Sequence, residues 1–154
     1  MLLTEMLTEK RIKAPLLATT KQEAIAELVD LLVADGAIAD RDKALAAVMD
    51  RENTRTTGIG NRIAIPHGKT TAVGELAMAV GIAATPIEFQ SIDQRPVSLL
   101  ILVVSPLDQT GPHIQALAHV SRLLSNDLFR HKLITAPNAH DAMKLIRLQE
   151  EADK

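Results

Sequence analysis

Thr57-Gly-Ile-Gly-Asn-Arg-Ile-Ala-Ile-Pro-His-Gly-Lys69 is the stretch on which the prediction of the fold and of the function depends. A glycine-rich turn leads into a very short apolar strand, 63–65, which we expect to end at Pro66 because proline has a fixed φ and no N–H for the ladder. His67 then follows directly after Pro66, whose fixed φ makes the backbone rigid there, and Gly68 leaves the imidazole uncrowded. A histidine in this setting can carry a reactive group, although a lone loop histidine is more often an ordinary surface residue.

Two helices are predicted before this stretch. Thr20-x-x-Glu23 has the spacing of a capping box, and apolar residues follow at helical spacing as far as a C-terminal stop at Gly36. Asp40 can cap a second helix that ends near Arg51-Glu52-Asn53. Residues 1–19 indicate only an approach segment with a short amphipathic turn.

Two apolar runs after the stretch predict the centre of a sheet. Residues 76–84 and 97–104 are strand-length, apolar on both faces and bounded by glycine or proline, which is typical of central strands covered by helices. Residues 87–89 are expected to form a short edge strand.

Three further helices are predicted, starting at Gly111-Pro112, Asn126 and Asn138. The charged tail, about 149–154, is expected to fray. Neither a repeat nor a linker interrupts the pattern, so residues 1–154 are predicted to form a single α/β domain in which helices flank a mostly buried sheet.

The composition excludes several classes of function. Only 1% of the residues are aromatic although 47% are hydrophobic, the net charge is −2, and Tyr and Trp are absent, so we expect no nucleic-acid partner. Cysteine is absent, which removes disulfides, thiolate metal sites and cysteine nucleophiles. The N-terminus has no signal-peptide pattern and the apolar runs are too short for a membrane span, so we expect a cytoplasmic protein without membrane insertion.

His67 has the surroundings that phosphoryl transfer requires. A neutral imidazole is nucleophilic near pH 7, and the protein then mainly has to position the phosphoryl group and balance its charge. Arg51 is the candidate cation, and backbone N–H groups of a glycine-rich turn can form an anion-binding nest. The candidate phosphate-binding residues are Thr56, Thr57, Gly58, Gly60 and Gly68.

His113 is the second candidate histidine. In the first turn of its predicted helix it can point from the edge of the core toward a site, where unpaired N–H groups favour an anion. Its alternative role is that of a hydrogen-bonded histidine at the core boundary. His119, His131 and His140 are scattered and match no catalytic pattern.

Other kinds of site have little support. The sequence has no H-E-x-x-H and no histidine pair at i, i+4, so no metal is expected, and it has no G-x-S-x-G of a Ser-His-Asp hydrolase. Gly58-x-Gly60 precedes a strand, whereas a dinucleotide fingerprint follows one, and a nucleotide P-loop is absent. We therefore expect no cofactor.

These residues resemble the IIA domains (EIIA type 2) of the fructose/mannitol class of the phosphoenolpyruvate-dependent phosphotransferase system, the PTS. The family's motif runs from an acidic residue across six positions to a short apolar strand that ends in Pro-His, and here it reads Glu52, Ile59-Gly60 and then 63–68. The resemblance extends over nearly the whole chain, including 20–25 and 97–113. It is closest to the stand-alone proteins of the nitrogen-related branch.

The resemblance implies a single-domain sandwich of a mixed sheet between helices. His67 would be phosphorylated on Nε2 by an HPr-type histidine phosphocarrier protein, and Arg51 and His113 match the family's phosphoryl-stabilising arginine and second active-site histidine. In the nitrogen-related branch the phosphorylation state regulates partners such as potassium transporters and sensor kinases. In the sugar-transport branches the phosphoryl group passes to a IIB domain and then to sugar.

Three functions remain in competition: a regulatory phosphocarrier, a sugar-uptake component, and a pure binding module that has lost the chemistry. The intact Arg51, His67 and His113 argue against the third, and the lack of a fused IIB or IIC domain favours the first. One residue departs from the family's pattern, because Arg62 stands where glycine is common. Its side chain is expected to point to solvent, although an added cation near the site could instead strengthen phosphate binding.

Overall fold

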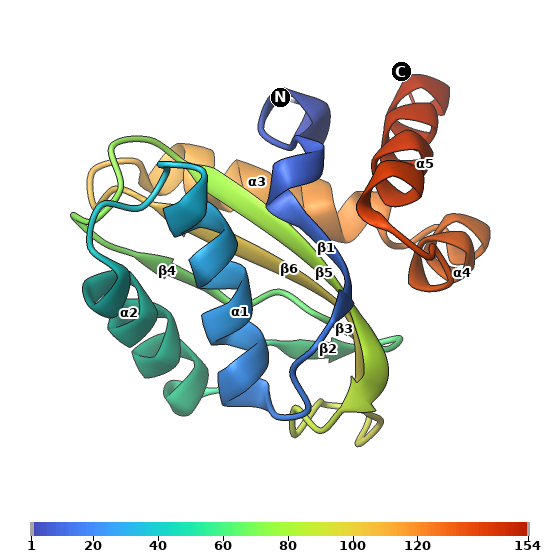
Figure 1. The fold of residues 1–154 in the computed structure, drawn as a ribbon, viewed down its shortest axis with the longest axis horizontal. Coiled ribbons are helices and arrows are strands. Elements are labelled where there is room, and N and C mark those ends of the chain that lie inside the picture. The colour runs from blue at the N-terminus through green and yellow to red at the C-terminus, as the bar shows by residue number, and fades with distance from the viewer. Residues whose placement is uncertain (1, 154) are drawn as a thin grey trace.

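A mixed six-stranded sheet forms the centre of residues 2–153, which are the residues that the computed structural model describes (Figure 1). Every residue of β6 (Val97–Ser105) is buried, and this strand pairs antiparallel with β5 and parallel with β3 and β4. The order is β1-β5-β6-β3-β2, with β4 also pairing with β6. The other strands are β1 (Ile12–Leu16), β2 (Gly58–Gly60), β3 (Ile63–Ala64), β4 (His67–Lys69) and β5 (Ala77–Ile87).

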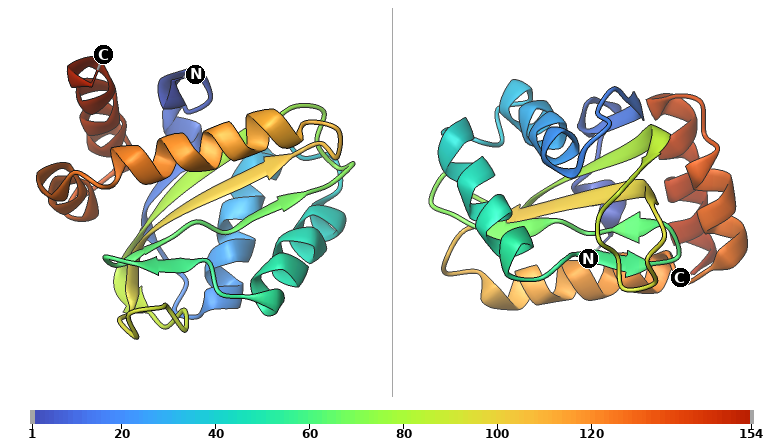
Figure 2. Two further views of the ribbon diagram at one scale, coloured as in Figure 1. Left: turned by 180° about the vertical axis from the view of Figure 1, so that it is seen from behind. Right: turned by 90° about the horizontal axis from the view of Figure 1, so that it is seen from below.

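Helices cover both faces of this sheet, which confirms the predicted sandwich. Figure 1 shows two of them in front of the sheet, α1 (Lys21–Ala34) and α2 (Arg41–Thr54). Figure 2 shows α3 (Thr110–Leu123) crossing the opposite face. The remaining helical segments are η1 (Leu3–Glu5), η2 (Glu9–Arg11), α4 (Asp127–Ile134) and α5 (Ala139–Ala152). Within residues 2–153, none of the helices has both the length and the apolar character that crossing a bilayer requires.

The predicted helix starts are confirmed where the sequence offered a capping side chain. Thr20, Asp40, Asn126 and Asn138 each accept a hydrogen bond from the backbone N–H three residues further along. The helix predicted from Gly111-Pro112 begins at Thr110, so this dipeptide lies in its first turn.

The first strand was missed in the prediction. Residues 12–16 were expected to belong to an approach segment, but they form β1, which pairs parallel with β5 at the edge of the sheet. Pro15 hides the pattern, although an edge strand tolerates proline. Leu16 is fully buried over Gly81, where a Cβ would come within 2.6 Å of Leu16 Cδ1. This pairing could not be read from local sequence because the partner lies far along the chain.

The first of the two predicted central strands is longer than expected. β5 continues through Pro86 to Ile87, so the separate edge strand expected at 87–89 does not exist. The register shifts between Ile82 and Ile87, where Ile87 pairs with Val97. Because the ladder is irregular there, the missing N–H of Pro86 breaks no regular hydrogen bond.

The glycine-rich segment before His67 also differs from the prediction. Residues 58–60 form β2 instead of a turn, and the turn follows at Asn61 and Arg62, with φ of 56° and 66°. Arg62 is exposed, as expected, and it adopts the left-handed conformation that glycine takes most readily. This backbone requirement explains why glycine suits the position.

Pro66 interrupts the sheet without ending it. Ala64 pairs with Leu100 and His67 pairs with Val103, so β3 and β4 keep one common register along β6. The carbonyl of Pro66 accepts a hydrogen bond from the N–H of Val103 at 3.0 Å, although its own nitrogen has no hydrogen to donate. His67 is therefore the first residue of a strand and does not stand on a loop after one.

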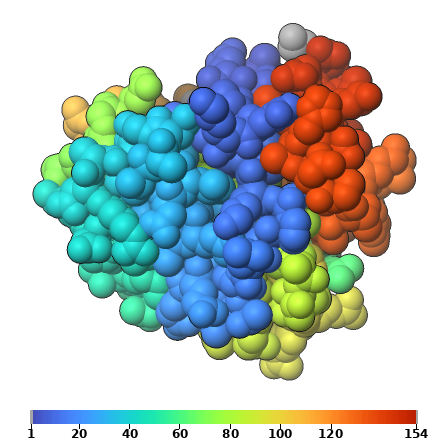
Figure 3. Space-filling view, in the orientation of Figure 1, coloured from blue at the N-terminus to red at the C-terminus, as the bar shows by residue number. Residues whose placement is uncertain are grey.

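The charged tail is ordered as far as it is described, so the expectation of fraying is wrong for residues 149–152. Glu150 is 3% exposed, and its carboxylate accepts hydrogen bonds from the N–H groups of Leu3 and Thr4 and from His119 Nε2. Figure 3 shows the two ends of the chain packed side by side on one face. Lys154 lies outside the described residues.

Gly68 is required for the close approach of α2 to β4. A Cβ on Gly68 would lie 3.1 Å from the backbone nitrogen of Val48 and 3.2 Å from the carbonyl carbon of Ala47. We expect Gly68→Ala to lower the free energy of unfolding by about 1–3 kcal/mol, because overpacking against backbone cannot be relieved by a rotamer change. Urea unfolding measures this change. Gly74→Ala is the matched control, since a Cβ there meets nothing within 4 Å; equal losses in the two variants would contradict the packing argument.

Candidate functional site

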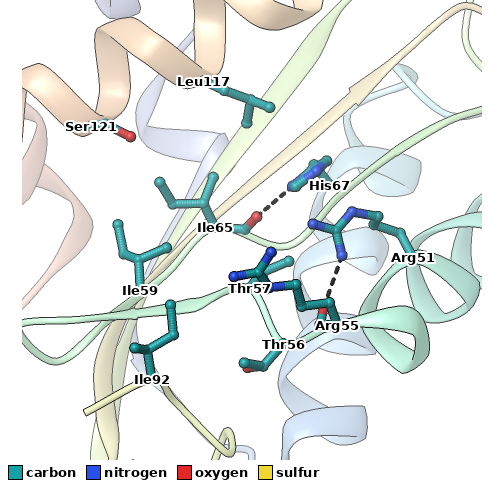
Figure 4. Close-up of a pocket in the computed structure, with 10 residues that line it drawn as sticks. All are labelled: Arg51, Arg55, Thr56, Thr57, Ile59, Ile65, His67, Ile92, Leu117 and Ser121. Atoms are coloured by element: carbon teal, nitrogen blue, oxygen red, sulfur yellow. Dashed lines mark hydrogen bonds between the residues drawn. The ribbon is translucent and has the colours of Figure 1, made fainter.

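His67 lies half-buried at one wall of a pocket of about 280 Å³ (Figure 4). Its Nδ1 lies 2.8 Å from the carbonyl oxygen of Ile65, and since a carbonyl only accepts, the neutral ring carries its proton on Nδ1. Within residues 2–153 no group is hydrogen-bonded to Nε2. The ring thus presents Nε2, with its lone pair, as the nitrogen available for a reaction.

The environment of His67 keeps its imidazole neutral. Burial lowers the pKa of His67 below its ordinary value, and the positive charge of Arg51 lowers it further, against the opposing effects of the Ile65 hydrogen bond and the Glu52 charge. At neutral pH the ring is therefore a base and a nucleophile and not a cation.

Two arginines from the end of α2 line the same pocket. Arg51 lies in the last turn of the helix, and its Nη1 donates to the carbonyl oxygen of Arg55 at 2.8 Å. Arg55 is exposed and was not singled out in the sequence. Figure 4 shows both guanidinium groups facing the pocket that His67 also faces. The pocket thus combines one neutral nucleophile with two permanent cations.

His113, which was expected to point toward the site from the edge of the core, lies beside His67 but is buried. Its ring centroid is 5.5 Å from that of His67, and only 5% of the residue is exposed. Nδ1 of His113 is hydrogen-bonded to Ser105 Oγ at 2.6 Å. Burial, together with the nearby His67 and Lys69, lowers the pKa of His113 to about 4. His113 is therefore a neutral neighbour of the nucleophile at pH 7.

Two of the backbone amides proposed for an anion nest already have partners. The N–H of Thr57 donates to Glu52 Oε2 at 2.8 Å, and the N–H of Gly58 donates to Thr56 Oγ1 at 3.1 Å. Thr56 and Thr57 line the pocket, whereas the three glycines of the predicted set, Gly58, Gly60 and Gly68, do not.

These glycines are better explained by backbone packing than by contact with an anion. A Cβ on Gly58 would collide with Ser91, and Gly60 has a φ of 94°. Gly68 admits the backbone of α2, as described above. All three glycines permit the backbone conformation and close packing of the segments on either side of His67.

The rest of the pocket is mostly apolar. Its lining includes Ile59, Ile65 and Ile92 on the sheet side, with Leu117 and Ser121 from α3. Ile59 and Ile92 are 44% and 66% exposed, so the rim of the pocket is an apolar surface open to solvent. Within residues 2–153, no group of three His, Asp or Glu residues is arranged to hold a metal ion.

Comparison with known proteins places this chain in a family. The family described as "Phosphoenolpyruvate-dependent sugar phosphotransferase system, EIIA 2" matches residues 5–148. The chain belongs to this family. It is therefore a IIA domain of the PTS, a phosphoryl-transfer carrier of the phosphotransferase kind.

Relatives of this IIA domain include both sugar-specific and nitrogen-regulatory proteins. The fructose-specific EIIA component of Haloferax volcanii is 41% identical over 117 residues, which cover 76% of each chain. The nitrogen regulatory protein of Escherichia coli K12 is 31% identical over 147 residues, 94% of this chain and 88% of the relative. The crystal structure of the nitrogen regulatory protein IIA-Ntr from Neisseria meningitidis has a TM-score of 0.81 at 25% identity, covering 94% of this chain and 98% of the other.

The buried His113 should make the stability of this IIA domain depend on pH. An unfolded chain, in which the histidine has its ordinary pKa of 6.5, binds more protons than the folded one above pH 4, so lowering the pH favours unfolding. Between pH 6.5 and 4.5, we expect His113 alone to cost on the order of 2 kcal/mol of unfolding free energy. Urea unfolding at the two pH values should show a smaller loss for His113→Gln than for wild type. The exposed His131→Gln should keep the wild-type pH dependence; identical slopes in all three proteins would refute the assignment.

Arg51 should lower the pKa of His67 directly. In Arg51→Gln the positive charge is gone, so we expect the pKa of His67 to rise when its ring signals are followed by NMR through a pH titration. Arg122→Gln is the control, because Arg122 lies on α3 beside His119. An unchanged His67 titration in Arg51→Gln would show that the guanidinium does not act on this ring.

Proposed function

We propose that Nε2 of His67 is the phosphoryl acceptor of this IIA domain and that the donor is an HPr-type phosphocarrier protein. One observation carries the proposal: Ile65 holds the Nδ1 proton, so the lone pair of Nε2 remains in a pocket lined by Arg51. The pocket opens through an apolar rim, which suits access by a protein donor.

The transfer exchanges one P–N bond for another. The Nε2 lone pair of His67 attacks the phosphorus of the donor's phosphohistidine, and the bond from phosphorus to the donor nitrogen breaks with its electron pair returning to that nitrogen. No proton has to leave His67, because its single ring proton stays on Nδ1 and continues to donate to the Ile65 carbonyl. The three phosphoryl oxygens retain their negative charge throughout.

Arg51 and His113 have distinct roles in this proposal. Arg51 is fixed by the Arg55 carbonyl, so its remaining N–H donors can balance the charge of the phosphoryl group without large reorganisation. His113 is neutral and fixed by Ser105, so its Nε2 can serve as a hydrogen-bond donor or as packing beside the phosphorylated ring.

The predicted regulatory role is supported by the nitrogen regulatory relatives, which match nearly the whole chain. In that role the phosphorylation state of His67 controls regulated partners such as a potassium transporter or a sensor kinase. The higher identity to the fructose-specific component favours a second candidate, in which the phosphoryl group passes to a IIB domain for sugar uptake.

Phosphorylation can be tested with purified components. Incubation with phosphoenolpyruvate, enzyme I and an HPr-type donor should give one acid-labile phosphate, assigned to Nε2 by ¹⁵N and ³¹P NMR. His67→Ala should accept none, whereas His131→Ala, which changes an exposed histidine on α4, should be labelled like wild type. Label on the His67→Ala protein, or an unlabelled wild type, would refute the proposal.

The acceptor distinguishes the two roles. The phosphorylated protein is mixed with a fructose-type IIB domain and loss of label from His67 is followed over time. Rapid, stoichiometric transfer identifies the sugar-uptake role, and retention of the label supports the regulatory one. Partner binding that ignores both phosphorylation and His67 substitution would indicate a binding module.

A further inference from the structure

A buried ion pair lies behind the pocket, on the side away from solvent. Glu52 follows Arg51 in α2 but its side chain is turned inward, where it is 1% exposed. Lys21, the first residue of α1, places Nζ 3.4 Å from Glu52 Oε2, and its own side chain is only 11% exposed. The same Nζ lies 5.0 Å from the centre of the Phe89 ring. Two charges this far from water have a large desolvation cost, which hydrogen bonds must offset.

Both carboxylate oxygens of Glu52 accept hydrogen bonds from the same residue of the pocket wall, Thr57. Oε2 accepts the Thr57 N–H at 2.8 Å, and Oε1 accepts the Thr57 hydroxyl. Thr57 is 4% exposed, so water cannot replace these bonds. Glu52 therefore fixes the backbone of Thr57 in both position and orientation.

From Thr57 the hydrogen bonds continue to the ring of His67. The Thr57 carbonyl accepts the N–H of Ile65 at 3.1 Å, and the Ile65 carbonyl accepts the Nδ1 proton of His67 at 2.8 Å. Each link fixes the position of the next backbone segment, so the orientation of the Ile65 carbonyl depends on where Thr57 is held. The continuous path is Lys21, Glu52, Thr57, Ile65 and His67.

We propose that Glu52 and Lys21 are positioning residues for the reaction of His67, acting through Thr57 and Ile65 to fix the Nδ1-protonated tautomer and the direction of Nε2. This inference rests on the proposed phosphoryl acceptance by His67. Glu52 acts a second time on the site, because a helix that is anchored by Glu52 also fixes Arg51, the neighbouring residue. Lys21 pairs with the buried carboxylate and orients it.

The decisive variant is Glu52→Gln, which keeps the shape and one acceptor oxygen but removes the charge. We expect phosphoryl transfer to His67 to fall about tenfold in kcat, since small errors in the direction of attack are costly. KM for the phosphorylated donor should change little, because the exposed rim is intact. Lys21→Met should have a smaller effect in the same direction.

Glu150→Gln is the matched control. Glu150 is buried like Glu52 and accepts two backbone N–H groups, but it binds the N-terminal segment and His119 instead of Thr57. It should lose comparable stability in urea unfolding while phosphorylating His67 at the wild-type rate. Equal losses of rate in the two glutamine variants would reduce Glu52 to a stabilising residue and overturn the proposal.

A readout that needs no donor separates this proposal from the proposed function. ¹⁵N NMR of the neutral His67 ring should show the Nδ1-protonated tautomer in wild type and in Glu150→Gln, and a shift toward the Nε2-protonated tautomer in Glu52→Gln. An unchanged tautomer together with an unchanged rate would refute the role of Glu52. If wild type accepts no phosphate, the proposed function fails, yet the tautomer measurement still decides whether Glu52 controls the ring.

Discussion

The register of β6 is the constraint on which the rest of this structure depends. All nine residues of this strand are buried, and it hydrogen-bonds to β5 on one side and to β3 and β4 on the other. Val103 pairs with His67, and two residues further along Ser105 is hydrogen-bonded to His113. One strand thus places both histidines, and a register change by one residue would turn its side chains to the wrong faces.

The pocket forms where three elements meet at the end of that strand. β4 supplies His67, the last turn of α2 supplies Arg51, and α3 supplies part of the apolar wall. His113, also on α3, lies beside His67 behind that wall. None of these contributions depends on a flexible loop. The close approach of α2 depends on the missing side chain of Gly68, and the inward turn of Glu52 fixes that helix to the wall of the pocket. Packing and chemistry therefore share the same residues.

Much of this arrangement could be predicted because its signals are local. Thr20, Asp40, Asn126 and Asn138 act as caps as soon as the next few residues turn helical, and the apolar run at 97–104 is buried on both faces. The features that were missed depend on partners remote in sequence. β1 becomes a strand only because β5 lies beside it, and the tail is ordered only because Glu150 meets Leu3 and Thr4.

The site also combines features that local sequence predicts with features that depend on remote partners. His67, Arg51 and His113 were predicted from motif and spacing, and the structure brings them together. The glycine-rich segment was expected to expose amides to an anion, but Glu52 and Thr56 occupy those of Thr57 and Gly58. Glu52 was noted only as part of a motif, because nothing in the neighbouring sequence reveals that Lys21 comes from another helix to neutralise it.

The strand pairing of His67 limits how far phosphorylation could change the shape of this protein. A residue that is held by strand pairing on one side and by the Ile65 carbonyl on its ring has little freedom to reorganise. A phosphoryl group, which adds a charge of roughly −1.5 to −2, would meet two guanidinium groups at this pocket and bring the local charge close to zero. The two states of the protein would then share one shape and differ in electrostatic potential, so a partner that discriminates between them has to do so by charge.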